Sequence, residues 1–345
     1  DGLTFLCASV PAALVTLFDL HKQLCHVNYD DAERVADLHG IVLDNRDRVL
    51  CEHCQLGKHT RSQARMKLPS ASITPVTSIV HSDIFGPATD SFFGKKRFAI
   101  VFIHGMTRYA HVYFMKHKSE ALVCFQQFCR DARILLPFDT LRADNDSVYR
   151  SQPFTAFCAQ HQILQQFSSV DTQSQNGVAE RYWRTLQDAT VTLLAHAGLQ
   201  KPFWTAAMAH ANYVRNRLPH SALQATSPYS AATGTVPDMS ALPTFGATAF
   251  VHVERSRRRK LDVKARRGIF LGVSPDSQSY LIWASDTNRL LTSRHSTIDV
   301  GSISPLPPLS LFGPSDDTPP VDSTTDDDLS SNTATAISTS SSAES

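Results

Sequence analysis

Three acidic residues lie where the sequence pattern predicts that regular elements begin or end. Asp83 follows a β-branched strand segment, Asp144 ends a second short strand, and Glu180 lies in the first turn of a long amphipathic helix. Sixty residues separate Asp83 from Asp144, and thirty-five separate Asp144 from Glu180. Neighbouring strands with a helix packed on them can bring such ends together. The spacing therefore favours a sheet whose strand ends meet one helix.

The order of the predicted elements indicates the class of fold. Between residues 77 and 170, three strands are followed by helix, strand, helix and strand, and a long helix comes next. This order predicts an α/β fold, with a mixed sheet carrying helices on its faces. Short strands bounded by turn residues follow at 245–300, and their spacing predicts a small β-barrel.

Composition and charge divide the chain of 345 residues further. The last 45 residues contain no Lys or Arg and seven of the 32 acids, so the first 300 carry 33 basic against 25 acidic residues. This basic body indicates a polyanionic partner. The predicted regions are a His- and Cys-bearing segment at 1–68, an α/β core at 77–235, a β-barrel at 245–300 and a disordered, acidic Ser/Thr/Pro-rich tail at 301–345.

The cysteines and the N-terminal residues bear on the compartment. Seven cysteines are odd in number and lack the spacing of a disulfide framework, which favours a reducing compartment. The first apolar run is interrupted by Ser9 and Pro11, is too short for a bilayer and lacks a basic start. We therefore expect no membrane partner and no secretion. The chain opens on Asp1, so we expect a piece of a longer product.

Two short motifs near the N-terminus predict a metal site. His21 and His26 form H-x4-H, and Cys51 and Cys54 form C-x2-C. Each spacing lets two ligands come from one turn, and imidazole with thiolate suits tetrahedral Zn²⁺. Four protein ligands leave no position for water, so the site would be structural. The competing interpretation is chance, because the chain holds 15 histidines. Nearby residues that could replace a ligand are Cys25, His39, His53 and His59.

The three acids predict a second metal site. Carboxylates around one pocket repel one another unless cations hold them, and Mg²⁺ prefers oxygen ligands. Two such ions about 4 Å apart can clamp both oxygens of an in-line phosphoryl displacement. Singly, each acid is also compatible with a turn or a helix dipole. We nevertheless expect Glu180 to face the sheet, because it continues the apolar stripe of its helix, formed by Trp183, Leu186, Thr190, Leu193 and Ala197.

These motifs, taken in order over roughly residues 15–300, resemble the integrase region of copia-type long-terminal-repeat retrotransposon polyproteins. "LHKQLCHV" and "CEHCQLGKHTR" are similar to the pre-integrase zinc segment. "HSDIFGP", "LRADN" and "QNGVAERYWRTL" are similar to the three parts of the D,D-35-E core. "KLDVKARRGIFLGV" resembles the SH3-like segment that follows.

The resemblance implies a fold, a reaction and a setting. The core would be a ribonuclease-H-like five-stranded sheet, preceded by a helical zinc segment and followed by an SH3-like barrel. Asp83, Asp144 and Glu180 would bind two Mg²⁺ or Mn²⁺ ions for 3′-end processing and strand transfer. Element and target DNA, a second copy of the chain and other products of the same polyprotein would be partners. The chain would work in the nucleus and in cytoplasmic virus-like particles.

The sequence departs from the family pattern at several positions. Asp146 lies where the family has a glycine, and His104-Gly105 replaces an acidic pair. Cys25 replaces a glycine before His26. These departures leave two rival interpretations. One is a catalytically inactive DNA-binding remnant, and the other is a ribonuclease-H-like nuclease without joining activity.

Basic and polar residues predict where DNA would bind. Residues 254–267 contain eight basic residues in fourteen, beside the predicted barrel. A solvated charge run is the alternative, but such a cluster in a basic body favours phosphate binding. The candidate DNA contacts are Gln175 and Asn176 in the loop before Glu180, Arg181 and Arg184 beside it, and Arg257, Arg258, Arg259 and Lys260 near the barrel.

Overall fold

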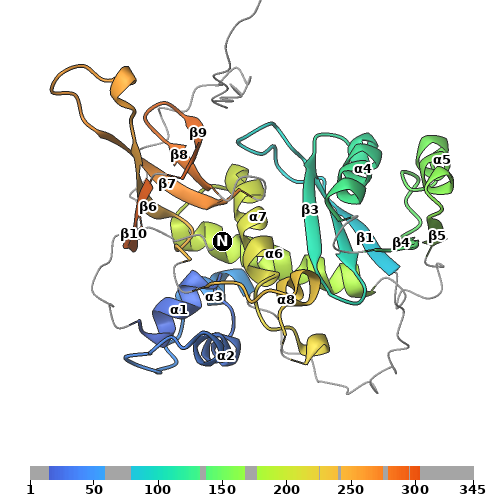
Figure 1. Ribbon diagram of the computed structural model, residues 1–345, viewed down its shortest axis with the longest axis horizontal. Helices are drawn as coiled ribbons and strands as arrows, with labels where there is room; N and C mark the ends of the chain where they lie inside the picture. Colours follow the sequence, from blue (N-terminus) through green and yellow to red (C-terminus); the bar gives the residue numbers. More distant parts are fainter. Residues whose placement is uncertain are drawn as a thin grey trace, which may run out of the picture. The chain divides into compact units, whose positions relative to one another are not determined.

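The computed structural model (Figure 1) describes residues 15–58, 79–132, 137–167, 177–224, 226–239, 242–274, 279–294 and 296–303. The chain divides into a unit of residues 1–313 and a unit of residues 314–345. All described residues belong to the first unit. The predicted tail lies almost entirely outside the described residues, and the four predicted region boundaries stay predictions.

Three short helices form the N-terminal segment: α1 (Leu17–Gln23), α2 (Tyr29–His39) and α3 (Glu52–Lys58). The side chains of Thr16 and Asn28 cap α1 and α2, because each accepts a hydrogen bond from a backbone N–H of the first turn. Gly40 ends α2 at φ 64°, a left-handed conformation that glycine adopts without a steric cost. The segment is helical, as the resemblance implied.

The central sheet has five strands in the order β3-β2-β1-β4-β5. The strands β1 (Ile79–Phe85), β2 (Phe98–His104) and β3 (Ala110–Met115) form an antiparallel meander. The strands β4 (Thr140–Ala143) and β5 (Leu164–Phe167) continue it in parallel to β1. This mixed sheet confirms the predicted ribonuclease-H-like core.

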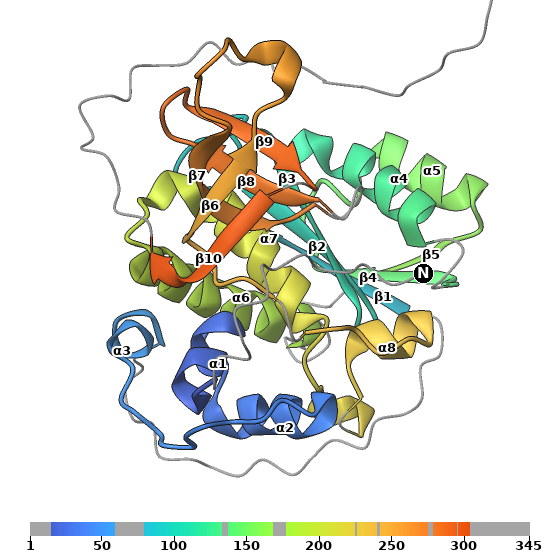
Figure 2. The same cartoon turned by 60° about the vertical axis from the view of Figure 1, so that its left-hand side comes forward.

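Helices cover both faces of this sheet (Figure 2). On one face, α4 (Ala121–Ala132) and α5 (Gln152–Gln160) pack on side chains such as Val80 and Phe102. On the other face, α6 (Gly177–Ala197) and α7 (Trp204–Arg215) pack on Val101 and Ile103. Alternate strand residues therefore serve opposite cores. A short helix, α8 (Pro228–Thr233), follows, and single 3-10 turns lie at Lys118–Glu120, Lys201–Phe203, Ser221–Leu223 and Arg255–Arg257.

A second, antiparallel sheet lies at the C-terminal end of the described chain. Its strands pair in the order β10-β6-β7-β8-β9. Phe270 and Ile282 point into the sheet's own core, whereas Ile269 and Leu271 pack with α7 in the central core. Both faces of the second half of β7 are thus buried. The strands are β6 (Ala247–His252), β7 (Ala265–Val273), β8 (Tyr280–Ala284), β9 (Arg289–Ser293) and β10 (Ser296–Ile303).

The N-terminal segment packs against the central core through α3 and α6. A Cβ atom on Gly57 would lie 2.2 Å from Thr192 Oγ1 and 2.9 Å from its backbone nitrogen. Only glycine allows this approach of the two helices. In the described part of the chain, no helix is both long and apolar enough to cross a membrane.

Candidate metal centres and nucleic-acid interface

The pairing of β1 with β4 places two of the predicted acids side by side. Val80 pairs with Leu141 and His81 with Arg142. Continuing this parallel register by two residues puts Asp83 opposite Asp144, which directly follows β4. The side chains of His81 and Asp83 share a face of the sheet, because strand residues alternate. That face is the one that α6 covers, since Val80 points to the opposite core.

Glu180 reaches the same place from the first turn of α6. The predicted apolar stripe from Trp183 to Ala197 is buried. Glu180 itself is exposed, so the expectation that its carboxylate turns inward against the sheet was wrong. It lies at the end of the stripe, near enough to Asp83 to act on the charge of that side chain.

Asp83 senses the other acids electrostatically. Burial raises the pKa of Asp83 to about 7, and the nearby carboxylates of Asp144, Glu180 and Asp146 raise it further within that total. The backbone N–H of Ile84 donates to Asp83 Oδ1 at 2.8 Å and opposes the shift. Burial also raises the pKa of Asp144. Among the described residues, no Lys or Arg forms an ion pair with Asp83, Asp144 or Glu180. Lys118 lowers the pKa of Asp144 through its charge but pairs with Asp146, so in the described chain the three carboxylates have no ion-pair partner, and a divalent cation would relieve their repulsion.

Two further contacts brace this end of the sheet. The buried hydroxyls of Ser82 and Tyr149 are 2.7 Å apart, which joins β1 to the segment after β4. Asp146 forms an ion pair with Lys118, with 2.6 Å between Oδ2 and Nζ. Neither Tyr149 nor Lys118 was predicted, because no short sequence spacing connects either residue to the acids.

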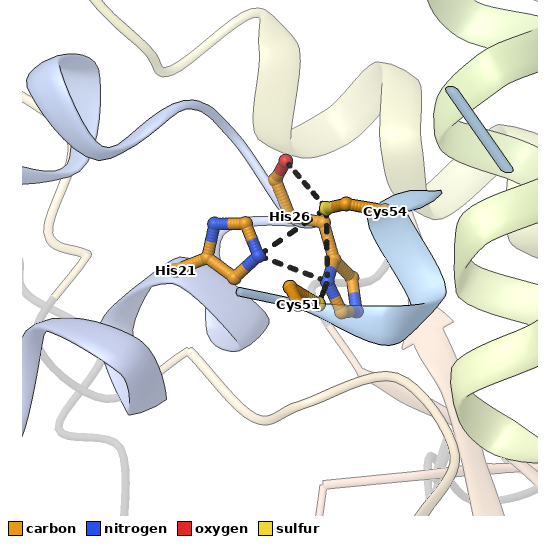
Figure 3. A group of neighbouring side chains, drawn as sticks. All are labelled: His21, His26, Cys51 and Cys54. Carbon is orange, nitrogen blue, oxygen red and sulfur yellow. Dashed lines mark hydrogen bonds between the residues drawn. The ribbon is translucent and has the colours of Figure 1, made fainter. Parts of the chain in front are cut away.

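The four predicted zinc ligands come together (Figure 3). One ligand atom from each of His21, His26, Cys51 and Cys54 lies within 4.8 Å of the others. His26 Nδ1 is 3.1 Å from His21 Nε2 and 3.3 Å from Cys51 Sγ, and Cys54 Sγ is 3.4 Å from His21 Nε2. Two imidazoles and two thiols at such distances suit a tetrahedral Zn²⁺ ion.

The histidines and the cysteines of the cluster differ in how their protons must change for a metal to bind. Burial lowers the pKa of His21 to about 4 and that of His26 to about 2, so both rings are neutral at pH 7. Burial also raises the pKa of Cys54 to about 11. Neutral imidazoles can bind a metal directly, whereas the thiols must lose their protons when a metal binds.

Each histidine ring of the cluster has a partner on its far side. His21 Nδ1 is 2.6 Å from the backbone oxygen of Val27, to which it donates when Nε2 binds a metal. His26 Nε2 is 2.7 Å from Nδ1 of His196, in the last turn of α6. His196 lies 170 residues from His26, and no sequence motif connects the two.

The turn that carries His26 has an unusual backbone. Cys25 and His26 adopt φ of 56° and 55°, in the left-handed region. The family's glycine at the position of Cys25 would adopt this conformation without a steric cost. Cys25 is buried and takes no part in the four-residue cluster, and neither does His39. His53 stacks on His196 instead of joining the ligands. His59 lies outside the described residues.

A group of basic side chains surrounds His81, which lies two residues before Asp83 on β1. Burial lowers the pKa of His81. The positive charges of Arg142, Arg108 and Arg181 lower it further, to about 4 in total. In the described chain, none of the three arginines has a carboxylate partner within ion-pair distance. Arg142 does hydrogen-bond the side-chain oxygen of Gln166, at 2.7 Å from Nη2. Arg181 was a predicted DNA contact, whereas His81, Arg108 and Arg142 were missed.

The other predicted DNA contacts occupy separate places. Arg184 is exposed on α6. Arg259 and Lys260 are exposed and Arg258 is half-buried, on the connection between β6 and β7. Arg257 belongs to a 3-10 turn in the same connection. Gln175 and Asn176 lie outside the described residues.

Comparison with known proteins shows which proteins the chain is similar to. Residues 247–308 match the model of the retroviral polymerase SH3-like domain. The chain is 31% identical over 250 residues, 71% of its length, to the Pol polyprotein of transposon TNT 1-94 from Nicotiana tabacum. It is 30% identical over 251 residues, 72% of its length, to that of transposon RE1 from Arabidopsis thaliana. The resemblance to copia-type Pol polyproteins is confirmed. The chain spans 18% and 17% of the length of these two relatives.

Solved structures of retroviral integrases show a weaker likeness. The catalytic core domain of BIV integrase covers 46% of this chain, and 95% of that domain is matched, at 16% identity and a TM-score of 0.35. The HTLV-2 integrase core in complex with magnesium covers 45% of the chain, with 96% of that core matched, at 15% identity and a TM-score of 0.36. The confirmed resemblance rests on the sequence matches and the SH3-like domain.

Proposed function

We propose that this chain is an integrase that joins retrotransposon DNA ends to target DNA. The observation that carries the proposal is the proximity of Asp83 and Asp144, at one end of the sheet, to Glu180 in the first turn of α6. Three neighbouring carboxylates with no ion-pair partner among the described residues are a poor arrangement for stability alone, because like charges repel. The similarity to copia-type Pol polyproteins, whose D,D-35-E motif the segments around the three acids resemble, supports this function.

The three carboxylates would hold Mg²⁺ or Mn²⁺, as one ion or a pair. Bound there, the metal would supply activation of the attacking hydroxyl and stabilisation of the leaving oxygen at a DNA phosphate. Asp83 and Asp144 would provide oxygen ligands from adjacent strands, and Glu180 would provide one from α6. The Ser82–Tyr149 hydrogen bond would hold the two strand ends at a constant separation.

The basic side chains would bind the phosphates on either side of the reacting one. His81 precedes Asp83 by two residues on the same face of β1, a step of about 6.6 Å. That step is similar to the separation of neighbouring phosphates along one strand of DNA. Arg108, Arg142 and Arg181 would therefore neutralise a phosphate next to the reaction centre, and the loop at Arg257–Lys260 would bind DNA further away.

The His/Cys cluster would bind one structural Zn²⁺. Its four ligands fill a tetrahedral shell, so it would take no part in the chemistry. We propose that the chain acts with further copies of itself and with other products of its polyprotein. Its setting would be a virus-like particle in the cytoplasm and then the nucleus.

A strand-transfer assay tests the proposal. The full chain is incubated with Mn²⁺, a labelled DNA duplex with the element's end sequence and a target plasmid, and joined strands are separated by size. Glu180→Gln should abolish joining, because it removes one carboxylate from the metal site. Asp188→Asn, the same carboxyl-to-amide change two turns further along the same helix, should retain joining as the matched control. Activity unchanged in Glu180→Gln would refute the assignment of the acids.

The products of the same assay distinguish the rival functions. Nicked DNA without joined strands would indicate a ribonuclease-H-like nuclease. DNA binding that weakens with salt, without nicked DNA or joined strands among the products, would indicate a catalytically inactive DNA-binding remnant. The Lys118–Asp146 ion pair speaks against the remnant, because the added acid of the second motif has a partner of its own.

A further inference from the structure

His196 connects the His/Cys cluster to the helix that carries Glu180. Its Nδ1 lies 2.7 Å from His26 Nε2. The other ring nitrogen of His26 faces the cluster, 3.1 Å from His21 Nε2 and 3.3 Å from Cys51 Sγ. The imidazole of His26 therefore lies between the cluster and α6, with one nitrogen directed to each.

This geometry determines where the protons are when a metal is bound. His26 can bind a metal through Nδ1 only if that nitrogen carries no proton, so the proton of the neutral ring resides on Nε2. Nε2–H then donates to Nδ1 of His196. A ligand histidine normally donates its second N–H to a carboxylate, a carbonyl or water, and this contact orients the ring. Here an imidazole from α6 takes that part.

Other contacts hold His196 and the segment in this arrangement. The ring of His53 stacks on that of His196, with centroids 5.0 Å apart and planes 18° from parallel. Lys58 Nζ donates to the backbone oxygen of His26 at 2.5 Å. Next to Lys58, Gly57 meets the backbone of α6 at Thr192, one helical turn before His196. The His/Cys cluster and the interface between α3 and α6 are therefore joined by one continuous set of contacts.

We propose that His196 is a positioning residue of the zinc site, through which Zn²⁺ occupancy and the docking of residues 15–58 on α6 form one linked equilibrium. The inference rests on the proposed zinc site. A metal that binds only the assembled ligands stabilises, by mass action, the contacts that hold those ligands in place. Because His26 requires His196 for its orientation, Zn²⁺ also stabilises the last turns of α6.

Zinc binding by the full chain tests this inference, with His196→Ala and His196→Asn as the variants. Affinity is measured by competition with a chromogenic zinc chelator. Alanine removes the acceptor and should weaken Zn²⁺ binding by about 10–100-fold. Asparagine can place its amide oxygen near the position of Nδ1 and should recover most of that loss. His252→Ala, at an exposed histidine on β6, should bind Zn²⁺ as the unmodified chain does.

Hydrogen exchange provides a second readout that needs no variant. In the unmodified chain, chelating Zn²⁺ should reduce amide protection in α3 and in the last turns of α6, around Leu193–Ala197. In His196→Ala, protection there should be low with or without Zn²⁺. The first turn of α4 should be unaffected in both cases.

The outcomes separate this inference from the proposed zinc site. If the unmodified chain binds no Zn²⁺, the zinc site is wrong and the linkage fails with it. If the chain binds Zn²⁺ but His196→Ala binds it as tightly as His252→Ala, the site stands and the role of His196 is refuted. If His196→Ala does not fold, the zinc affinity of His196→Asn and the hydrogen exchange of the unmodified chain test the inference instead. If adding Zn²⁺ to the unmodified chain does not increase amide protection in α6, the inference is overturned.

Discussion

Lys118 Nζ lies 2.6 Å from a carboxylate oxygen of Asp146, two residues beyond the predicted metal ligand Asp144. Burial alone would raise the pKa of Asp146, but Lys118 and the backbone N–H of Val148 outweigh it and lower the pKa below the ordinary value. The acid that replaces a family glycine thus remains charged and has a cation beside it. The extra charge is paired with Lys118, although it still acts on the nearby carboxyls of Asp83 and Asp144.

We expect Asp146→Asn and Asp144→Asn to differ widely in Mn²⁺-dependent joining. Asp146→Asn removes a partly exposed ion pair and should change the rate by no more than about fivefold. Asp144→Asn removes a predicted metal ligand and should lower the rate by about 100-fold or more. Single-turnover joining of a labelled end measures both rates. Equal losses would mean that Asp146 is itself a ligand.

Asp83→Asn should stabilise the folded chain at high pH when Mg²⁺ and Mn²⁺ are absent. The folded-state pKa of Asp83, about 7, lies above its ordinary value of 3.8, so the folded chain holds this proton longer than the unfolded chain. The unmodified chain therefore loses stability as pH rises from about 4 through 7. Denaturant unfolding at pH 5 and 8 should show the variant gaining about 1–3 kcal/mol relative to the unmodified chain. A difference independent of pH would contradict the burial of this carboxyl.

His210→Leu should make the chain less sensitive to acid. His210 is 1% exposed, its ring lies among Phe245 and Phe270, and neither ring nitrogen has a partner in the described structure. Burial lowers its pKa to about 3. Below pH 6.5, His210 binds a proton in the unfolded chain but stays neutral in the folded chain. The free energy of unfolding therefore falls as pH falls from 6.5 toward 3.

This loss has a slope of at most about 1.4 kcal/mol per pH unit for one group. At pH 7 the leucine variant should unfold at nearly the same denaturant concentration as the unmodified chain. At pH 5 it should be more stable by about 1–2 kcal/mol. His252→Ala, at an exposed histidine, should show no such difference. A parallel decline of the leucine variant and the unmodified chain would indicate that His210 has a water or another partner.

Gly57→Ala should weaken the packing of α3 on α6. The new methyl group would lie 2.2 Å from Thr192 Oγ1 and 2.9 Å from the Thr192 nitrogen, so one helix must shift. We expect a loss of about 1–3 kcal/mol in stability. Adding Thr192→Ala to Gly57→Ala should recover part of the loss, because it removes the nearest atom but not the backbone. Denaturant unfolding of the two variants and of Thr192→Ala alone measures this coupling.

Several features of the site could be predicted because they depend on short spacings or on strand ends. H-x4-H and C-x2-C place ligands on single turns, and the four side chains meet as the spacings indicated. Asp83 and Asp144 follow from the parallel pairing of two recognisable strands. The alternation of strands and helices was enough to give the mixed sheet.

The features that were missed depend on contacts between distant elements. The hydrogen bond of His26 to His196 forms only because α3 packs on α6, and nothing local to either histidine indicates it. The same applies to Arg108, which reaches His81 from the turn between β2 and β3. Glu180 was expected to face inward because periodicity identifies an apolar stripe but not the residue at which burial of that stripe ends.

The length of α6 between Glu180 and His196 has a consequence for how such a chain can change over time. His196 lies sixteen positions after Glu180, which is about 24 Å along the helix and roughly 160° around its axis beyond four whole turns. One helix therefore presents an acid on one side and a histidine on nearly the opposite side. Inserting or deleting a single residue between them would rotate one end by about 100° relative to the other. Such an insertion or deletion would leave every residue of both sites in the sequence. The side chains of Glu180 and His196 would nevertheless no longer face their two sites at the same time.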